Sequence, residues 1–419
     1  MQDPSTRLDV SAALGCGLAA AAAALLSSGW IAPFLPYREF DNVYFQTDCS
    51  LVYSNMTERL SNHYRTGMHP LFSILTWPLV SVLRGLGLET FSAVRALLVA
   101  NAGAMGSLAF LVLRRAELER FDAALFALSL AGSVTLLFFG SVPETFTFGG
   151  TTILLMLWIA GQARPSLRAL VLGNVATMSM TLTNWMTGIA GTFLVDPKDR
   201  RTQVRVWLIA GAVVALLGML SKLVFPSSGY AGDCRRYVHW IRVPQLSDVR
   251  SFFVHSTVMP VPLFRPPPDV GFLEAVAEPV AVMSGGPLGA GATIGWLVLL
   301  AAGGYAVVKR AKNRRLGSVL LVAVAGQLAL HLCFADGPFL FSSHFAPLLL
   351  LVAAHARLLP LPKWPVRVAA GALLLAIGLN NVTQHRAATR GLETRFLPWL
   401  EQHGTARFVG TPLPRHGGR

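Results

Sequence analysis

"VSAALGCGLAAAAAALLSSGWI", residues 10–31, carries no charged side chain over its whole length. A helix of about 20 apolar residues is long enough to cross a bilayer. A cleaved signal peptide is the alternative, because the stretch is rich in small residues. The preceding "MQDPSTRLDV" has one arginine against two aspartates, which is weak for a signal peptide. We therefore expect a retained first membrane helix.

Composition extends this expectation to the whole chain. Of its 419 residues, 53% are hydrophobic and 13% charged, and mean hydropathy is +0.53, whereas soluble domains carry about 25% charged residues. The net charge of +14 does not predict a nucleic-acid partner, because the cations form short runs between apolar segments, as the positive-inside rule produces. These runs are "RRAELER" (114–120), "KDRRTQVR" (198–205) and "KRAKNRR" (309–315).

The pattern predicts an all-α, polytopic transmembrane helix bundle of about 10–12 membrane segments. Two segments need separate treatment. Segment 70–84 is short and contains Pro78, so we expect an interfacial or re-entrant helix on the outer side, continuing the first outer loop. Segment 168–194 is long and interrupted by "TLTNW" (181–185), which predicts two short helices. The remaining apolar segments are 10–32, 91–113, 122–140, 145–162, 204–225, 284–308, 316–334, 339–356 and 365–383.

This topology places the basic runs on the inner side of the membrane. The polar and aromatic loops then gather on the outer side, which favours a site that faces outward. We expect an outer loop at 33–69, a larger one at 226–283, a second set of membrane helices at 284–383 and a polar tail at 384–419.

The first outer loop holds the densest set of reactive side chains. For any single residue, ordinary surface charge is the simpler interpretation, but the loop as a whole favours function. Its aromatic residues suit the headgroup level. The charged and histidine residues of the loop are Arg38, Asp41, Asp48, Glu58, Arg59, His63, Arg65 and His69.

Other candidates lie in later outer segments. Glu144 in "SVPETF" either caps a helix or serves a site, since a carboxylate at a membrane rim is costly. Lys222 either snorkels to the interface or contacts phosphate. Arg235 and Arg236 suit phosphate oxygens. His344 is either a substrate contact or a helix histidine whose hydrogen bonds are satisfied within the protein. No HExxH, CxxC, Walker or GxSxG motif is present.

In this order the motifs resemble the GT-C superfamily of integral-membrane glycosyltransferases. The acidic first loop ends in "HPLF" (69–72), where members carry an "HPP"-like element. An inner basic turn follows in "LRRAELERF" (113–121), then "SVPETF", then a break at "LTNW" (182–185). The resemblance covers about residues 10–225. This chain departs from the pattern with glutamate at 144 and asparagine at 184.

The resemblance implies inverting transfer of a sugar from a polyprenyl-phosphate donor, in a bacterial plasma membrane and on its outer side. It implies a carboxylate base, for which Asp48 is preferred and Asp41 is the alternative, with Glu144 positioning the acceptor or a metal. It does not decide whether a divalent cation is needed, because only some members of the superfamily use one. The implied phosphate and substrate contacts are Arg59, His63, Arg65, His69, Lys222, Arg235, Arg236 and His344.

Two rivals use the same features differently. A carrier of lipid-linked sugars would need the arginines and no base, although transporters often show internal repeats, which this chain lacks. An O-antigen polymerase or ligase would place its key loop late in the chain. The sugar, the acceptor and the oligomeric state stay open.

Overall fold

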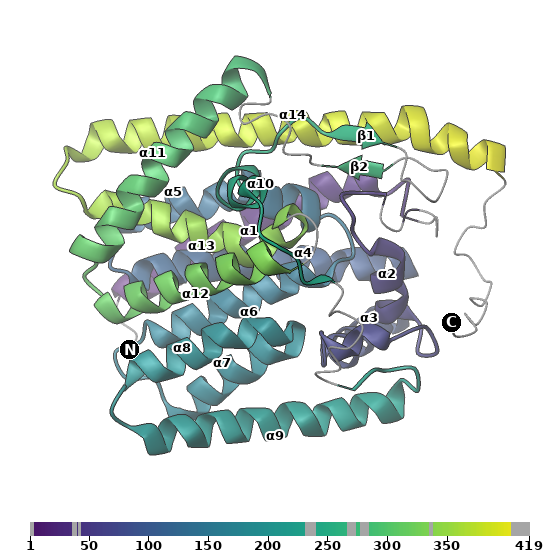
Figure 1. Ribbon diagram of the computed structural model, residues 1–419, viewed down its shortest axis with the longest axis horizontal. Coiled ribbons are helices and arrows are strands. Elements are labelled where there is room, and N and C mark those ends of the chain that lie inside the picture. Colours follow the sequence, from purple (N-terminus) through teal and green to yellow (C-terminus); the bar gives the residue numbers. More distant parts are fainter. Residues whose placement is uncertain are drawn as a thin grey trace.

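The computed structural model describes residues 4–35, 40, 43–230, 240–265, 274–276, 285–334 and 338–403, and these form an all-α bundle (Figure 1). Within that part of the chain, seven helices are long and apolar enough to cross a membrane. The protein is therefore a polytopic membrane protein, as predicted. The seven spans are Arg7–Ile31, Thr90–Arg115, Arg200–Val224, Gly286–Arg310, Arg314–Cys333, Pro338–Leu358 and Lys363–Pro398.

Long helices form the frame of the bundle, and shorter helices fill it. The frame consists of α1 (Pro4–Ile31), α4 (Thr90–Arg115), α9 (Arg200–Val224), α11 (Gly286–Arg310), α12 (Arg314–Cys333) and α14 (Lys363–His403), and the shorter α13 (Ser342–Ala354) lies inside it. The shorter helices are α2 (Cys49–Thr57), α3 (Phe72–Gly85), α5 (Arg120–Ser129), α6 (Thr145–Ala160), α7 (Leu167–Met180), α8 (Trp185–Val195) and α10 (Leu246–Arg250).

Tight helical turns and one small hairpin complete the described structure. The 3₁₀ turns are η2 (Tyr64–Gly67), η3 (Leu130–Gly132), η5 (Leu182–Asn184), η8 (Pro338–Phe341) and η9 (His355–Leu358), and the π-helical turns are η4 (Thr135–Phe139) and η7 (Ser251–His255). Strand β1 (Leu263–Arg265) pairs antiparallel with β2 (Glu274–Val276).

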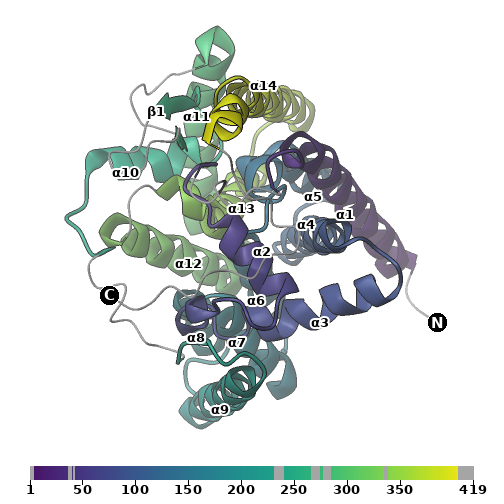
Figure 2. The same ribbon diagram turned by 90° about the vertical axis from the view of Figure 1, so that its right-hand side faces the viewer.

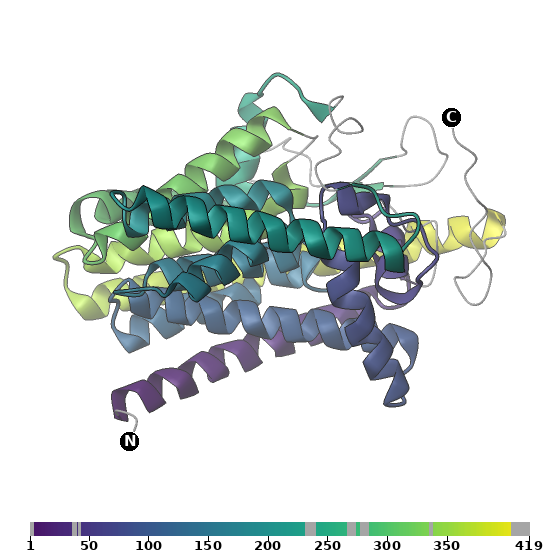
Figure 3. The same cartoon turned by 90° about the horizontal axis from the view of Figure 1, so that it is seen from below.

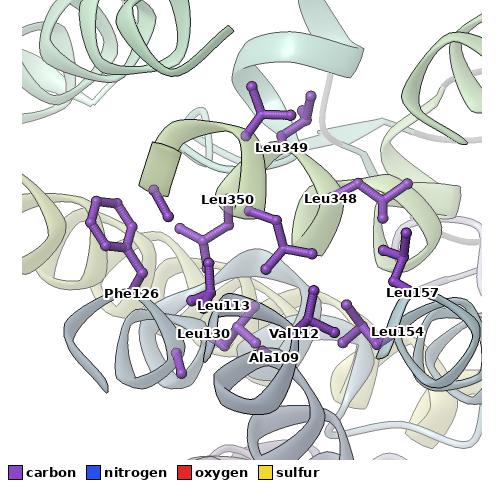
Figure 4. Packing of buried hydrophobic residues seen from close by; sticks show 14 of the residues in the cluster. Ala109, Val112, Leu113, Phe126, Leu130, Leu154, Leu157, Leu348, Leu349 and Leu350 are labelled. Carbon is purple, nitrogen blue, oxygen red and sulfur yellow. The ribbon is translucent and has the colours of Figure 1, made fainter. Parts of the chain in front are cut away.

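Helix α13 lies at the centre of the bundle, where its apolar side chains meet those of α4 and α6 (Figure 4). Every described residue of α13 is buried, which explains why "SSHFAPLLLLVAA" has no polar face. A Cβ atom at Gly150 of α6 would lie 2.1 Å from the Ser343 carbonyl oxygen, so glycine permits direct contact of the two helices.

The interrupted segment 168–194 folds as predicted into two short helices. α7 and α8 are joined by η5, and each is too short to cross a hydrocarbon core of about 30 Å. The Asn174 side chain fixes the pair: its amide donates to Thr192 Oγ1 (2.8 Å), and its oxygen accepts from Trp185 Nε1 (2.9 Å).

Three expectations about segment bounds need correction. Residues 384–403 are not a polar tail, because α14 continues through them to His403. The last span is therefore longer than the expected 365–383. Segment 122–140 is not one helix: α5 ends at Ser129, and the 3₁₀ turn η3 and the π-helical turn η4 follow.

The first loop folds against one end of the bundle, which we call the site end. Seen along the helices, α2 and α3 lie across this end, with α10 and β1 to one side (Figure 2). In the view from below, α9 (teal) runs across the front of the bundle, and α1 (purple) lies along its lower edge (Figure 3). Helices within the first loop were predicted, and α2, η2 and the start of α3 supply them.

Candidate functional site

Three separate segments meet at the site end. Asp48 directly precedes α2, and its carboxylate makes no cap hydrogen bond. Arg65 lies in η2, and Glu144 is the N-cap of α6. Charged side chains from loop, turn and helix cap therefore converge, together with His69 and Thr145, in what we call the carboxylate–arginine cluster.

Arg65 joins the two carboxylates. Its Nη1 atom lies 2.5 Å from Asp48 Oδ2, and its Nη2 atom lies 3.6 Å from Glu144 Oε1. The Asp48 backbone N–H also donates to Glu144 Oε2 at 3.1 Å. Solvent reaches the side chains unequally: Asp48 is 32% exposed, Arg65 9% and Glu144 0%. Asp48 is thus the more accessible of the two acids.

Glu144 has a structural task within the cluster. Its Oε1 atom accepts from the Thr145 backbone N–H at 2.7 Å and from the Thr145 hydroxyl at 3.0 Å. Burial raises the pKa of Glu144, and the nearby Arg65 guanidinium opposes that rise. Both oxygens of Glu144 are therefore occupied by α6 and by the loop that carries Asp48. Glu144 therefore holds the start of α6 and the loop in place, and the Asp48 carboxylate, paired with Arg65, is the one that solvent reaches.

His69 connects the cluster to the break between α7 and α8. Its Nδ1 atom lies 2.6 Å from the Met180 carbonyl oxygen and donates to it. Nε2 is then the acceptor, 3.4 Å from Arg65 Nη2 and 3.5 Å from Thr145 Oγ1. Burial, followed by the adjacent Arg65 charge, lowers the pKa of His69, so the ring is neutral.

Backbone strain marks the approach to Asp48. Phe45 and Gln46 have φ of 52° and 62°, in the left-handed region. Such residues cost about 1–3 kcal/mol each and persist only where their surroundings hold them. Phe45 is buried against Phe138 and Phe339, at ring-centroid distances of 5.4 Å in both cases. The aromatic packing therefore fixes the turn that presents Asp48.

The structure does not bring three of the predicted phosphate contacts into the cluster. The His63 ring is buried, bonded to Ser73 Oγ (2.9 Å) and packed on Phe225 at 4.4 Å. Arg59 Nε donates to the Val224 carbonyl at 2.8 Å, and Lys222 Nζ donates to the Ser228 carbonyl at 2.6 Å. Arg59 thus satisfies a carbonyl at the end of α9, a favourable place for a cation, and Lys222 binds the loop that follows this helix.

His344 follows the turn η8 directly and is buried inside the bundle. It occupies the first turn of α13, is 1% exposed and packs edge-on against Phe146 at 5.3 Å. Phe146 lies in the first turn of α6, next to Glu144 of the cluster. Asp41, Arg235 and Arg236 lie outside the described residues.

Sequence reasoning missed a buried polar row below the cluster. Gln327 donates to Asn184 Oδ1 at 2.9 Å, and its own oxygen lies 3.1 Å from His331 Nε2. The signal was present in "GQLALHLC", because Gln327 and His331 are four residues apart on an apolar helix and so share a face. Asn184 was noticed only as part of the break.

The cluster has a definite chemical capacity. Asp48 can accept a proton from a group that enters from solvent, and Arg65 supplies fixed positive charge beside it. Across the described ranges, no group of three or more histidine, cysteine, aspartate or glutamate side chains is arranged to hold a metal. A divalent cation is therefore suggested only by the resemblance to glycosyltransferases, some of which use one.

Fold and site together define an all-α polytopic membrane protein with a recessed carboxylate–arginine cluster at one end of the bundle. Neither the models of known protein families nor the curated proteins contain a match to this chain.

Proposed function

We propose that this protein is a membrane glycosyltransferase that moves a sugar from a polyprenyl-phosphate donor to a hydroxyl acceptor, with Asp48 as general base. One observation carries the proposal. Asp48 is the more exposed of two carboxylates that share Arg65, and a capped, strained backbone holds it in place. An orienting acid beside a reacting acid is the division of labour that such a transfer needs.

The reaction balances with the groups at hand. The acceptor hydroxyl oxygen attacks the anomeric carbon and forms the new glycosidic bond. Its proton passes to the Asp48 carboxylate. The bond between the anomeric carbon and the donor phosphate oxygen breaks, and its electron pair leaves with the lipid phosphate. Attack from the face opposite the leaving group inverts the anomeric centre.

Arg65 and Glu144 support this step through position and charge. Arg65 keeps the Asp48 carboxylate aimed by a 2.5 Å ion pair. Its guanidinium has five N–H donors, so it can contact a developing phosphate charge while still paired. Glu144 holds the Asp48 backbone N–H, and His69 limits where Nη2 of Arg65 can lie.

The proposal includes a location: a bacterial plasma membrane, with the cluster on the outer side. Apolar spans place the chain in a membrane. The outward orientation is supported by the gathering of basic residues at the opposite end of the bundle, because cationic loops favour the inner side. Lipid-linked donor and membrane lipids are the partners this location offers.

The test is sugar transfer by Asp48→Asn in membranes supplied with a radiolabelled polyprenyl-phosphate sugar. Loss of the base should lower the rate by roughly 10²–10⁴-fold, with little change in the amount of folded protein. Glu58→Gln is the matched control, because Glu58 is an exposed acid of the same loop. It should transfer at the native rate.

Two outcomes contradict the proposal. Transfer by Asp48→Asn at the native rate removes Asp48 as the base. Movement of labelled lipid across the bilayer without any transfer, by the native protein, replaces the transferase with the carrier interpretation. Because donor identity is open, the assay uses a panel of hexosyl and pentosyl donors.

A further inference from the structure

A groove of about 650 Å³ runs between α1 and α4, away from the carboxylate–arginine cluster. Leu14, Gly17 and Leu25 mark its course along α1, while Arg95 and Gly103 line it from α4. A Cβ atom at Gly17 would lie 2.8 Å from the Gly103 carbonyl oxygen, so the helices touch at the floor of the groove. Since both helices are membrane spans, the groove opens toward lipid.

Arg95 gives the groove a charged end. Its Nε atom donates to Ser28 Oγ at 2.6 Å, and Nη2 donates to the Leu25 carbonyl at 2.5 Å. Both partners are neutral. Among the ion pairs of the described residues, none includes Arg95. Arg95 lies near the start of its membrane span, where the phosphates of anionic lipids are the counter-charges at hand, so an anion would complete this site.

The length of the groove indicates the kind of anion. From Leu25 to Leu14 the α1 backbone rises about 16 Å, which equals about half of a 30 Å hydrocarbon core. The groove therefore runs from the headgroup level at Arg95 to the bilayer midplane. A phospholipid acyl chain fills one leaflet, whereas a polyprenyl chain is much longer than this.

We propose that the groove binds one anionic phospholipid of the leaflet at the site end, with its phosphate on Arg95 and an acyl chain along α1 and α4. Ser92, one turn before Arg95 and also at the groove, offers a second donor to the headgroup. The binding is independent of the proposed sugar transfer, because no groove residue belongs to the carboxylate–arginine cluster.

Native mass spectrometry of the detergent-purified full chain tests the proposal. Protein is incubated with dioleoyl phosphatidylglycerol, or with dioleoyl phosphatidylcholine, which has the same chains and no net charge. We expect one phosphatidylglycerol retained per chain and little phosphatidylcholine. Arg95→Gln should weaken phosphatidylglycerol binding about tenfold, since a charged hydrogen bond is lost. Ala100→Trp, which fills the groove, should weaken it as well.

Three further variants separate binding from bracing. Arg84→Gln removes an exposed arginine near the same end and should bind as the native chain does. Arg95→Lys keeps the charge and should retain most of the lipid. Ser28→Ala removes one of the two bonds from Arg95 to α1, leaves the charge and should also retain the lipid. Loss of lipid in Ser28→Ala equal to that in Arg95→Gln would show that Arg95 only braces the helices.

Other results would overturn the proposal directly. These are equal retention of both phospholipids, undiminished phosphatidylglycerol on Arg95→Gln, or displacement of phosphatidylglycerol by equimolar polyprenyl phosphate. The last would make the groove a donor site. A failure of sugar transfer would leave all of these measurements unchanged, so the two hypotheses are tested separately.

Discussion

At the scale of single residues, Arg65 holds the cluster together by charge. It is almost buried, lies between two carboxylates and also faces the neutral His69 ring. Buried ion pairs add little net stability compared with an apolar core, yet breaking one is expensive, because the remaining charge stays buried. Glu144 is the group that would be left, since it is 0% exposed.

Arg65→Met should therefore lower the free energy of unfolding by about 3 kcal/mol, measured by denaturation in mixed micelles. Arg65→Met combined with Glu144→Gln should recover part of that loss, because the fully buried charge is then gone and the remaining Asp48 carboxylate is partly exposed to solvent. Arg59→Met, at an exposed position, should change stability by less than about 1 kcal/mol. Strict additivity of the first two substitutions would argue against the buried pair.

His63 makes stability depend on pH. Burial lowers its pKa from 6.5 to about 4, although two backbone contacts oppose this. Between those values the unfolded chain binds more protons than the folded one, so stability falls as pH drops through this window. The contribution is fully present above pH 6.5 and is of order 3 kcal/mol. His63→Gln should reduce the slope of stability against pH between pH 6.5 and 4; an unchanged slope would assign the dependence to other groups.

At the scale of elements, the sequence predicted a helix break correctly where an apolar segment was too long for one span and contained polar residues. Segment 168–194 was too long for one span and held Asn184 among threonines, and both facts pointed to the observed break. α14 was misjudged, because "NVTQHRAATRGLETRF" is polar on average. Its buried positions, His385, Ala388, Leu392 and Phe396, recur at helical spacing, but their apolar partners come from the first loop and from η4, far away in the sequence.

The same limit applies to the candidate site. Asp48, Arg65, His69 and Glu144 could be named from residue type and order. Their mutual distances could not, because they depend on how the first loop meets α6 and the end of α7. His63, Arg59 and Lys222 carry equally suggestive side chains, yet local carbonyl and hydroxyl partners hold them elsewhere.

The end of α14 is expected to support the loop that carries Asp48. Phe396 is fully buried against Phe34 and Phe40, at ring-centroid distances of 6.5 and 5.8 Å. Phe396→Ala should cost roughly 3–4 kcal/mol and should speed hydrogen exchange in residues 43–57. Thr394→Ala, on the exposed face of the same helix, is the control. If residues 43–57 of Phe396→Ala exchange hydrogen as slowly as those of the control, the loop is stable without support from α14.

At the scale of the whole molecule, charge divides the bundle into two ends. Opposite the site end, Asn313 donates to the carbonyls of Arg115 (3.2 Å) and Gly161 (3.1 Å), which brings the ends of α4 and α6 beside the start of α12. Arg367 of α14 pairs with Asp122 of α5 at the same end. The basic residues at this end, on α4, α5, α11, α12, η9 and α14, are Arg114, Arg115, Arg120, Arg310, Arg314, Arg315, Arg357, Lys363 and Arg367.

This asymmetry predicts the orientation of the protein, because loops rich in lysine and arginine are retained in the cytoplasm. In a variant with all four cysteines replaced by serine, Val243→Cys at the site end should react with a membrane-impermeant maleimide in intact cells. Glu117→Cys at the basic end should react only after permeabilisation. Both positions are exposed, so access to solvent within the protein does not limit labelling. The reverse pattern would turn the carboxylate–arginine cluster toward the cytoplasm, where an outward-facing transfer could not occur.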